Sequence, residues 1–140
     1  MNYGYADAAI SDDSDLIAFG CQRVVYKLGM FGRCKLFQRE QIPYVDWNIL
    51  RWSCILAGCD YLKGGLKGWG VKSAIRHIRK ADNGGREYTR ADFLAKFTDD
   101  PEFENRFVQA DNMFLYQKVQ NPINREILTL NPIVRAKVDL

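Results

Sequence analysis

The sequence predicts a mixed α/β fold, with short strands near the N-terminus followed by a helical region. Residues 23–37 place β-favouring side chains around Gly29 and Gly32, which predicts two short strands joined by a turn. Apolar residues then recur at helical spacing at residues 45–56 and 71–78, and residues 100–119 are expected to form a further, long helix. The chain has 140 residues, which is about one domain with a single core.

Residues that commonly mark the start or end of a helix occur in the first half of the chain. Residues 15–20 predict one or two helical turns that end at Gly20. In the helix over residues 45–57, Asp46 stands near the start and Gly58 follows the end.

The second half has similar signals. A glycine-rich turn at residues 64–70 precedes a helix at about residues 71–81. After a loop over residues 81–89, Thr89 is the expected N-cap of a short helix, and Pro101 lies in the first turn of a long one. Residues 121–132 are expected to form a tail with a short extended stretch.

The composition is that of an ordinary soluble globular protein, with 47% hydrophobic and 26% charged residues. No apolar run approaches the length of a membrane span, so we expect no membrane association. With His77 as the only histidine, a zinc site has too few partners, and a Ser-His-Asp triad would have to depend on that one residue, so acyl-transfer chemistry is not expected. Without a C-x-x-C pair, the cysteines are expected to be small, buried, reduced side chains: Cys21, Cys34, Cys54 and Cys59.

Charge is distributed unevenly along the chain. Residues 1–61 carry six Lys/Arg and seven Asp/Glu, a net −1, whereas residues 62–140 carry fourteen and ten, a net +4. The window 62–80 holds six basic residues and no acid. An acidic cluster in one half and this basic window in the other suggest a metal site beside a polyanion site.

Asp13 and Asp15 are spaced so that both carboxylates can face one cation such as Mg²⁺, which offsets their repulsion. Asp12 is either a further member or only solvated. Asp60 follows an apolar helix, where an acid is costly to desolvate unless it is paired or coordinated. The alternatives for Asp60 are a helix cap and an ion pair with a nearby lysine.

The basic window predicts contact with a phosphate backbone. Gly68 and Gly70 flank Trp69 in a turn that leads into a helix N-terminus, where free N–H groups attract anions. Basic side chains follow on one face of that helix, at Lys72, Arg76 and Arg79 or Lys80. The alternatives are a solvated basic face and, for Trp69, a ring packed under the turn rather than stacked on a base.

Three segments together carry a family resemblance: "SDDSDLIAFGC", "CILAGCDYL" and "GLKGWGVKSA". They resemble the structure-specific 5′ nucleases of the flap endonuclease superfamily, and so do "FVQADNMFLYQKVQNP" and "ILTLNP" downstream. The resemblance implies that residues 1–57 are the C-terminal part of an internal nuclease domain with a PIN-like or resolvase-like parallel sheet. Residues 58–132 would form a helix-three-turn-helix DNA-binding region, and residues 133–140 a tail.

The resemblance also implies site residues. Asp13, Asp15 and Asp60 would be catalytic ligands of two Mg²⁺ ions that hydrolyse a phosphodiester. A monovalent cation, K⁺, would sit on backbone carbonyls of the glycine hairpin. The residues implied to hold duplex DNA are Lys67, Gly68, Trp69, Gly70, Lys72 and Arg76.

The implied function is that of a nuclear DNA-repair enzyme, either a 5′→3′ double-stranded DNA exonuclease or a 5′-flap endonuclease. Its substrate would be duplex DNA with a 5′ end, nick or flap, and repair proteins would be its partners. In this superfamily further catalytic acids precede the D-x-D motif, so we expect the 140 residues alone to be incomplete and inactive. The alternatives are a truncated, non-catalytic module that binds duplex DNA, and a structural domain whose acids are only solvated.

Overall fold

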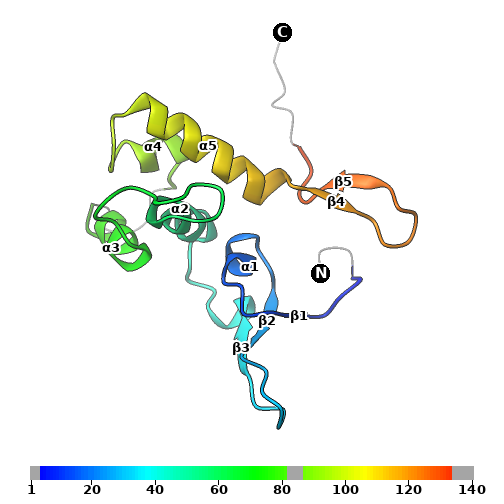
Figure 1. Cartoon of the computed structure of the whole chain (residues 1–140). Helices are drawn as coiled ribbons and strands as arrows, with labels where there is room; N and C mark the ends of the chain where they lie inside the picture. Colours follow the sequence, from blue (N-terminus) through cyan, green and yellow to red (C-terminus); the bar gives the residue numbers. More distant parts are fainter. Residues whose placement is uncertain (1–3, 82–86, 134–140) are drawn as a thin grey trace.

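The computed structural model describes residues 4–81 and 87–133. A small sheet lies near the N-terminus, helices make up the centre, and a β-hairpin follows the longest helix (Figure 1). The mixed α/β class predicted from the sequence is therefore confirmed. The elements are β1 (Ala9–Ile10), α1 (Asp15–Ala18), β2 (Arg23–Tyr26), β3 (Lys35–Gln38), a 3₁₀ turn (Arg39–Gln41), α2 (Trp47–Ala57), α3 (Val71–Ala81), α4 (Arg90–Leu94), α5 (Pro101–Tyr116), β4 (Lys118–Gln120) and β5 (Ile127–Thr129).

The first sheet has the strand order β1-β2-β3. β1 and β2 are parallel and are connected through α1, whereas β2 and β3 form an antiparallel hairpin. The turn of that hairpin lies where the glycines predicted it, with the Gly32 N–H donating to the Gly29 carbonyl at 3.0 Å. The acidic segment consequently lies at the carboxyl end of a parallel strand, a position where open α/β sheets commonly place ligands.

Buried residues of α1 and of the later helices α2, α3, α4 and α5 belong to the same hydrophobic core. α2 packs against α3 and α5, and its residues Trp52, Ile55 and Leu56 are buried in that core. Because α2 contributes to the same core as the later helices, it fixes the acidic loop relative to the basic helix. The domain boundary at residues 57 and 58 stays a prediction.

The predicted helix starts are confirmed. Asp46 accepts hydrogen bonds from the Asn48 and Ile49 N–H groups, Thr89 forms a capping box with Asp92, and Pro101 opens α5. Part of the predicted loop before Thr89, residues 82–86, lies outside the described residues, as does the tail beyond Ile133.

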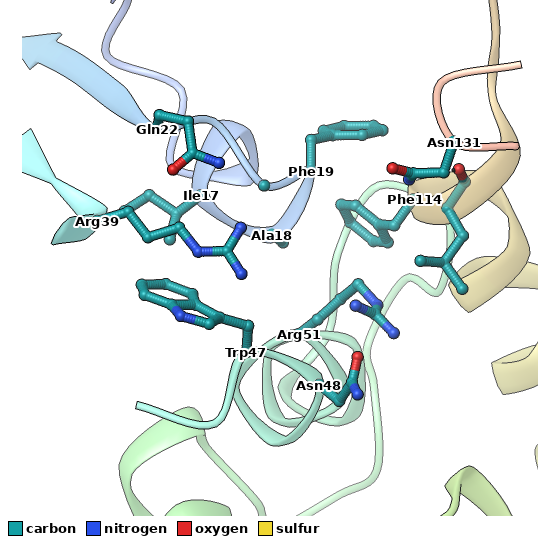
Figure 2. Close-up of a pocket in the computed structure, with 12 residues that line it drawn as sticks. Ile17, Ala18, Phe19, Gln22, Arg39, Trp47, Asn48, Arg51, Phe114 and Asn131 are labelled. Carbon is teal, nitrogen blue, oxygen red and sulfur yellow. Dashed lines mark hydrogen bonds between the residues drawn. The ribbon is translucent and has the colours of Figure 1, made fainter. Parts of the chain in front are cut away.

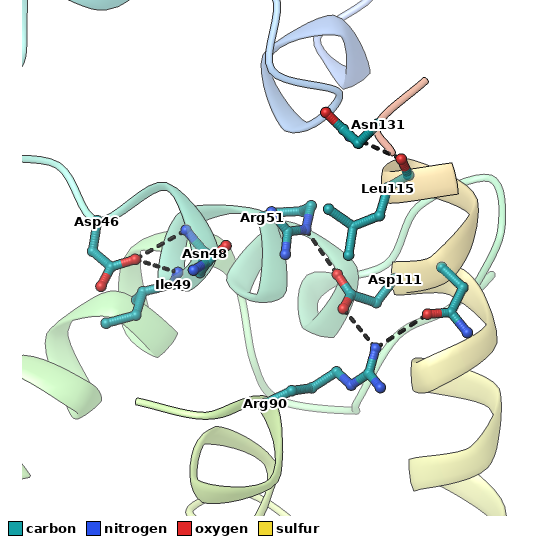
Figure 3. A network of polar contacts seen from close by, with 9 residues as sticks. Asp46, Asn48, Ile49, Arg51, Arg90, Asp111, Leu115 and Asn131 are labelled. Atoms are coloured by element: carbon teal, nitrogen blue, oxygen red, sulfur yellow. Dashed lines mark hydrogen bonds and ion pairs between the residues drawn. The ribbon is translucent and has the colours of Figure 1, made fainter. Parts of the chain in front are cut away.

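A buried polar network ties α2, α4 and α5 together (Figure 3). The Asp111 carboxylate on α5 accepts from Arg51 Nε on α2 at 2.7 Å and from an Arg90 guanidinium nitrogen at the start of α4 at 2.9 Å. Asp111 is 2% exposed and Arg51 is 8% exposed. Pairing of this kind is what allows charged groups to lie inside a core.

Two expectations are wrong. α5 ends at Tyr116 rather than near residue 119, because residues 118–120 pair with residues 127–129 as the antiparallel hairpin β4–β5. That pairing is a hairpin between neighbouring segments, and the helical period does not report strand pairing. Cys34 is exposed rather than buried, because it lies in the exposed turn between β2 and β3, and the other cysteines are half-buried free thiols.

Within the described residues, no helix has both the length and the apolar character that a membrane span requires.

Candidate functional site

The loop between β1 and α1 holds its aspartates in different ways. Asp13 accepts a hydrogen bond from the Asp15 N–H at 2.9 Å, which closes the loop on the first turn of α1. Asp12 instead accepts from the Lys27 N–H at 2.7 Å and so ties the loop to the β2–β3 hairpin. The structure therefore separates a structural acid, Asp12, from the pair Asp13 and Asp15.

The third carboxylate, Asp60, belongs to the segment after α2, within electrostatic range of Asp15. Cys59 and Leu62 pair as a short antiparallel bridge, with N–H···O distances of 3.2 and 3.1 Å, so that Asp60 and Tyr61 form the tip of a tight turn. Asp60 is exposed, which removes the desolvation argument made from its apolar neighbours. No ion pair between Asp60 and a lysine occurs among the described residues.

These carboxylates act on one another electrostatically. Burial raises the pKa of Asp15, and the negative charges of Asp13 and Asp60 raise it further. Mutual repulsion of this kind is relieved by a cation, and carboxylate oxygens are the donors that Mg²⁺ prefers. Among residues 4–81 and 87–133, however, no three Asp, Glu, His or Cys side chains are grouped closely enough to hold a metal ion. The donor chemistry thus fits a divalent ion, while these side chains do not by themselves complete a centre.

An aromatic cluster behind the acids holds the two acidic segments together. The Phe19 ring lies 4.7 Å from that of Phe114, and the Tyr61 ring stands edge-on to Phe114 at 5.2 Å. α1 and the Asp60 turn are therefore both anchored on α5. Burial raises the pKa of Tyr61, and the neighbouring acids add to this, Asp15 and Asp60 foremost.

The sequence interpretation missed this cluster. Tyr61 could have been found by its position next to Asp60. Phe114 is more than fifty residues away in the chain and has no local signal.

The nearby thiols are not nucleophiles. Burial raises the pKa of Cys54 to about 11, and the charge of Asp15 contributes to that shift. The pKa of Cys59 is also raised, mainly by burial. Both side chains are thus protonated near neutral pH, which leaves the carboxylates as the candidate groups for chemistry.

Gly65 allows the segment after Asp60 to pack directly on the end of α2. The Leu66 N–H donates to the Leu56 carbonyl at 2.7 Å, and Gly65 has a φ of +51°. A Cβ at Gly65 would overlap the backbone of Leu56, Ala57 and Gly58. Gly68 also has a positive φ, +90°, but nothing lies within 4 Å of a Cβ built there.

We therefore expect Gly65→Ala to lower the free energy of unfolding by about 2–3 kcal/mol, combining left-handed backbone strain with overpacking. Gly68→Ala carries only the backbone strain and should cost about 1 kcal/mol. Urea denaturation of the two variants measures the difference. Equal losses would contradict the close packing of this segment on α2.

The glycine hairpin leads into α3. The Gly70 N–H donates to the Ser73 hydroxyl at 2.9 Å, and that hydroxyl donates to the Gly70 carbonyl at 2.8 Å. The Ala74 N–H then donates to the same carbonyl at 2.9 Å and begins the helical ladder. This arrangement fixes the turn rigidly at the start of the helix.

α3 has the two faces predicted from its sequence. Ala74 and Ile78 are buried in the core. The predicted basic face is exposed, at Lys72, Arg76, Arg79 and Lys80, and Lys67 is exposed in the turn before it. Acidic side chains are absent from this window, so the face presents positive charge to solvent.

Trp69 packs under the turn, as one of the two sequence interpretations predicted. Its ring stands edge-on to Phe97 at 4.7 Å and lies 5.1 Å from His77. The half-buried indole thus supports the hairpin from below. A role for Trp69 in contact with DNA stays a prediction.

Comparison with known families matches residues 1–60 to the XPG I-region. That segment contains the acidic loop, the first sheet, α2 and Asp60. The recognition of the flap endonuclease superfamily, made from three short segments of the sequence, is confirmed by this match and by the relatives of the whole chain.

Those relatives are exonucleases. The chain is 34% identical to exonuclease 1 of Danio rerio over 91% of its length, and 33% identical to exonuclease 1 of Xenopus laevis, also over 91%. It is 36% identical to exodeoxyribonuclease 1 of Schizosaccharomyces pombe over 90% of its length. The chain is thus a relative of exonuclease 1, and it spans 17%, 19% and 23% of these three proteins.

Proposed function

We propose that this chain carries part of the active site and the duplex-binding surface of a 5′ deoxyribonuclease. The observation that supports this most strongly is the electrostatic coupling of Asp13, Asp15 and Asp60, which come from two segments anchored on one aromatic cluster. The exposed basic face of α3 follows in the same helical core. The activity itself is a 5′→3′ exonuclease or a 5′-flap endonuclease, in keeping with the names of the relatives.

Asp13, Asp15 and Asp60 are the residues that would hold Mg²⁺ at this site. When bound, a pair of such ions activates a water and stabilises the leaving oxygen in phosphodiester hydrolysis. The chain's own part is to hold the carboxylates in place: the Asp13–Asp15 hydrogen bond fixes one segment, and the Cys59–Leu62 bridge fixes the other. Because no three such side chains are grouped among the described residues, a working centre needs further ligands beyond these.

The glycine hairpin and α3 would hold the phosphate backbone of duplex DNA. Lys67, Lys72 and Arg76 provide exposed charge, and Gly68 and Gly70 let the backbone approach closely, with K⁺ on the hairpin carbonyls. The contacts are with phosphates, so recognition depends on DNA structure more than on sequence. Nuclear DNA repair, with repair proteins as partners, is the setting that the resemblance to the superfamily implies.

The second candidate is a non-catalytic module that binds duplex DNA. The observation that favours it is the absence of a three-ligand group among the described residues. Incubation of the protein in its full-length context with 5′-recessed, nicked and flapped duplexes, with and without Mg²⁺, separates the candidates. Metal-dependent cleavage supports the nuclease, and salt-sensitive binding without cleavage supports the module. If the protein shows neither cleavage nor salt-sensitive binding, a structural domain is supported.

The double variant Lys72→Ala, Arg76→Ala tests the basic face. We expect duplex affinity to fall about tenfold or more at ~0.1 M salt, equally for unrelated sequences. The slope of log K against log salt should flatten by about 2, since two phosphate contacts are lost. Fluorescence anisotropy over a salt series measures both.

A matched control removes two other exposed basic residues, Arg106 and Lys118, from α5 and β4. This variant has the same net charge as the first and should keep most of the salt slope. If both variants lose the same slope, binding depends on net charge alone and the α3 assignment is wrong.

A further inference from the structure

A pocket of about 210 Å³ lies between the C-terminal end of α1, the start of α2 and the C-terminal end of α5 (Figure 2). Phe19 and Phe114 form an apolar wall. Its polar lining consists of Gln22, Arg39, Trp47, Asn48, Arg51 and Asn131. The proposed nuclease function uses none of these polar residues.

Two arginines, Arg39 and Arg51, line the pocket. Arg39 extends over Trp47, with its guanidinium carbon 4.2 Å from the ring centre, and Arg51 lies beside it on α2. No lining residue is Asp or Glu. Among the described residues no carboxylate forms an ion pair with Arg39, because Glu40 pairs with Arg23 instead.

The positive charge of Arg51 is only partly neutralised, by a carboxylate that does not line the pocket. Asp111 is its carboxylate partner, and Asp111 is shared with Arg90. Arg51 and Arg90 therefore share a single negative charge, and Arg39 has no carboxylate partner among the described residues. The consequence appears at Arg39, where burial lowers the pKa and repulsion from Arg51 lowers it further.

We propose that this pocket binds a phosphate group. Two guanidiniums, which suit the planar, forked recognition of phosphate oxygens, lie together with three side-chain amides that can complete its hydrogen bonds. At ~30 Å³ per water, the volume holds about seven waters, which is ample for one tetrahedral oxyanion. The anion relieves the repulsion between Arg39 and Arg51.

The site is separate from the carboxylates. Asp15 begins α1, whereas the pocket is lined by the residues that end it, from Ile17 to Gly20. Asp13, Asp15 and Asp60 are not among the residues that line the pocket. Binding of phosphate here consequently does not depend on the metal ligands proposed above.

The test titrates inorganic phosphate into the 140-residue chain at constant ionic strength and follows arginine Nε–H and Trp47 indole signals by NMR. We expect saturable shifts at Arg39 and Trp47 with a dissociation constant on the order of 1 mM. Arg39→Gln should weaken binding about tenfold or more. Arg33→Gln, at an exposed arginine of the β2–β3 turn, is the matched control and should change nothing.

A second variant keeps Arg39 and its contact with Trp47. Asn48→Asp places a carboxylate at the pocket, and Asp suits the first turn of α2, so the fold should be retained while phosphate binding is lost. Shifts that do not saturate, or that are equal in all variants, overturn the proposal.

Two sources of phosphate are distinguished by adding a short duplex. If the duplex produces the same shifts and Asn48→Asp abolishes them, the pocket takes a phosphate of the DNA backbone. If phosphate still titrates the pocket in the presence of saturating duplex, the ligand is a free phosphate or phosphomonoester.

Discussion

In the full-length context, replacing Asp15 or Asp60 with alanine should abolish the proposed metal-dependent cleavage, by at least about 10³-fold in rate. Each carboxylate contributes negative charge to the place where we propose that divalent ions bind, and each acts on the other electrostatically. Metal-ion catalysis supplies several kcal/mol of transition-state stabilisation, and each 1.36 kcal/mol is a factor of ten in rate. Cleavage of a 5′-labelled duplex under single-turnover conditions measures the loss.

Duplex binding should change little in these variants, since the removed carboxylates provide no attraction to the DNA phosphates. Asp99→Ala, which removes an exposed acid at the loop before α5, is the matched control and should keep full activity. A variant at Asp15 or Asp60 that cleaves as fast as the Asp99 control would show that the carboxylate is not a metal ligand. Loss of both cleavage and binding would indicate misfolding, which circular dichroism detects.

Asp111→Ala should lower the free energy of unfolding by about 3–5 kcal/mol, the range for a buried ion pair that loses one partner. Arg51 is 8% exposed and would keep its charge without a carboxylate, and Arg90 would lose the same partner (Figure 3). Asp111 joins α2, α4 and α5, so the loss acts on the whole helical core. Chemical denaturation followed by tryptophan fluorescence gives the value.

Glu40→Ala breaks a comparable pair at the surface. Glu40 lies 3.2 Å from Arg23, and their side chains are 62% and 44% exposed, so this change should cost under about 1 kcal/mol. Asp111→Asn keeps the shape of the side chain and should fall between the two. Similar losses for Asp111→Ala and Glu40→Ala would contradict a structural role for the buried network.

The sequence alone determined the elements whose signals are local. Asp46, Thr89 and Pro101 mark helix starts because a cap satisfies N–H groups within its own first turn, and the structure confirms all three. The exposed and buried faces of α3 follow from the 3.6-residue period in the same way. The family resemblance came from the combination of short segments in order, since each one alone is a weak signal.

Tertiary structure decided what depends on residues far apart in the chain. Nearer in the chain, the helical period could not end α5 at Tyr116 either, because it does not report that residues 118–120 pair with β5 in a hairpin. It could not show that Phe114 supports the acids, that Asp60 is exposed, or that Asp111 holds Arg51 and Arg90 together. The phosphate pocket arises in the same way: Arg39, Arg51 and Asn131 converge only when α1, α2 and α5 pack, because burial and charge balance are properties of the assembled core.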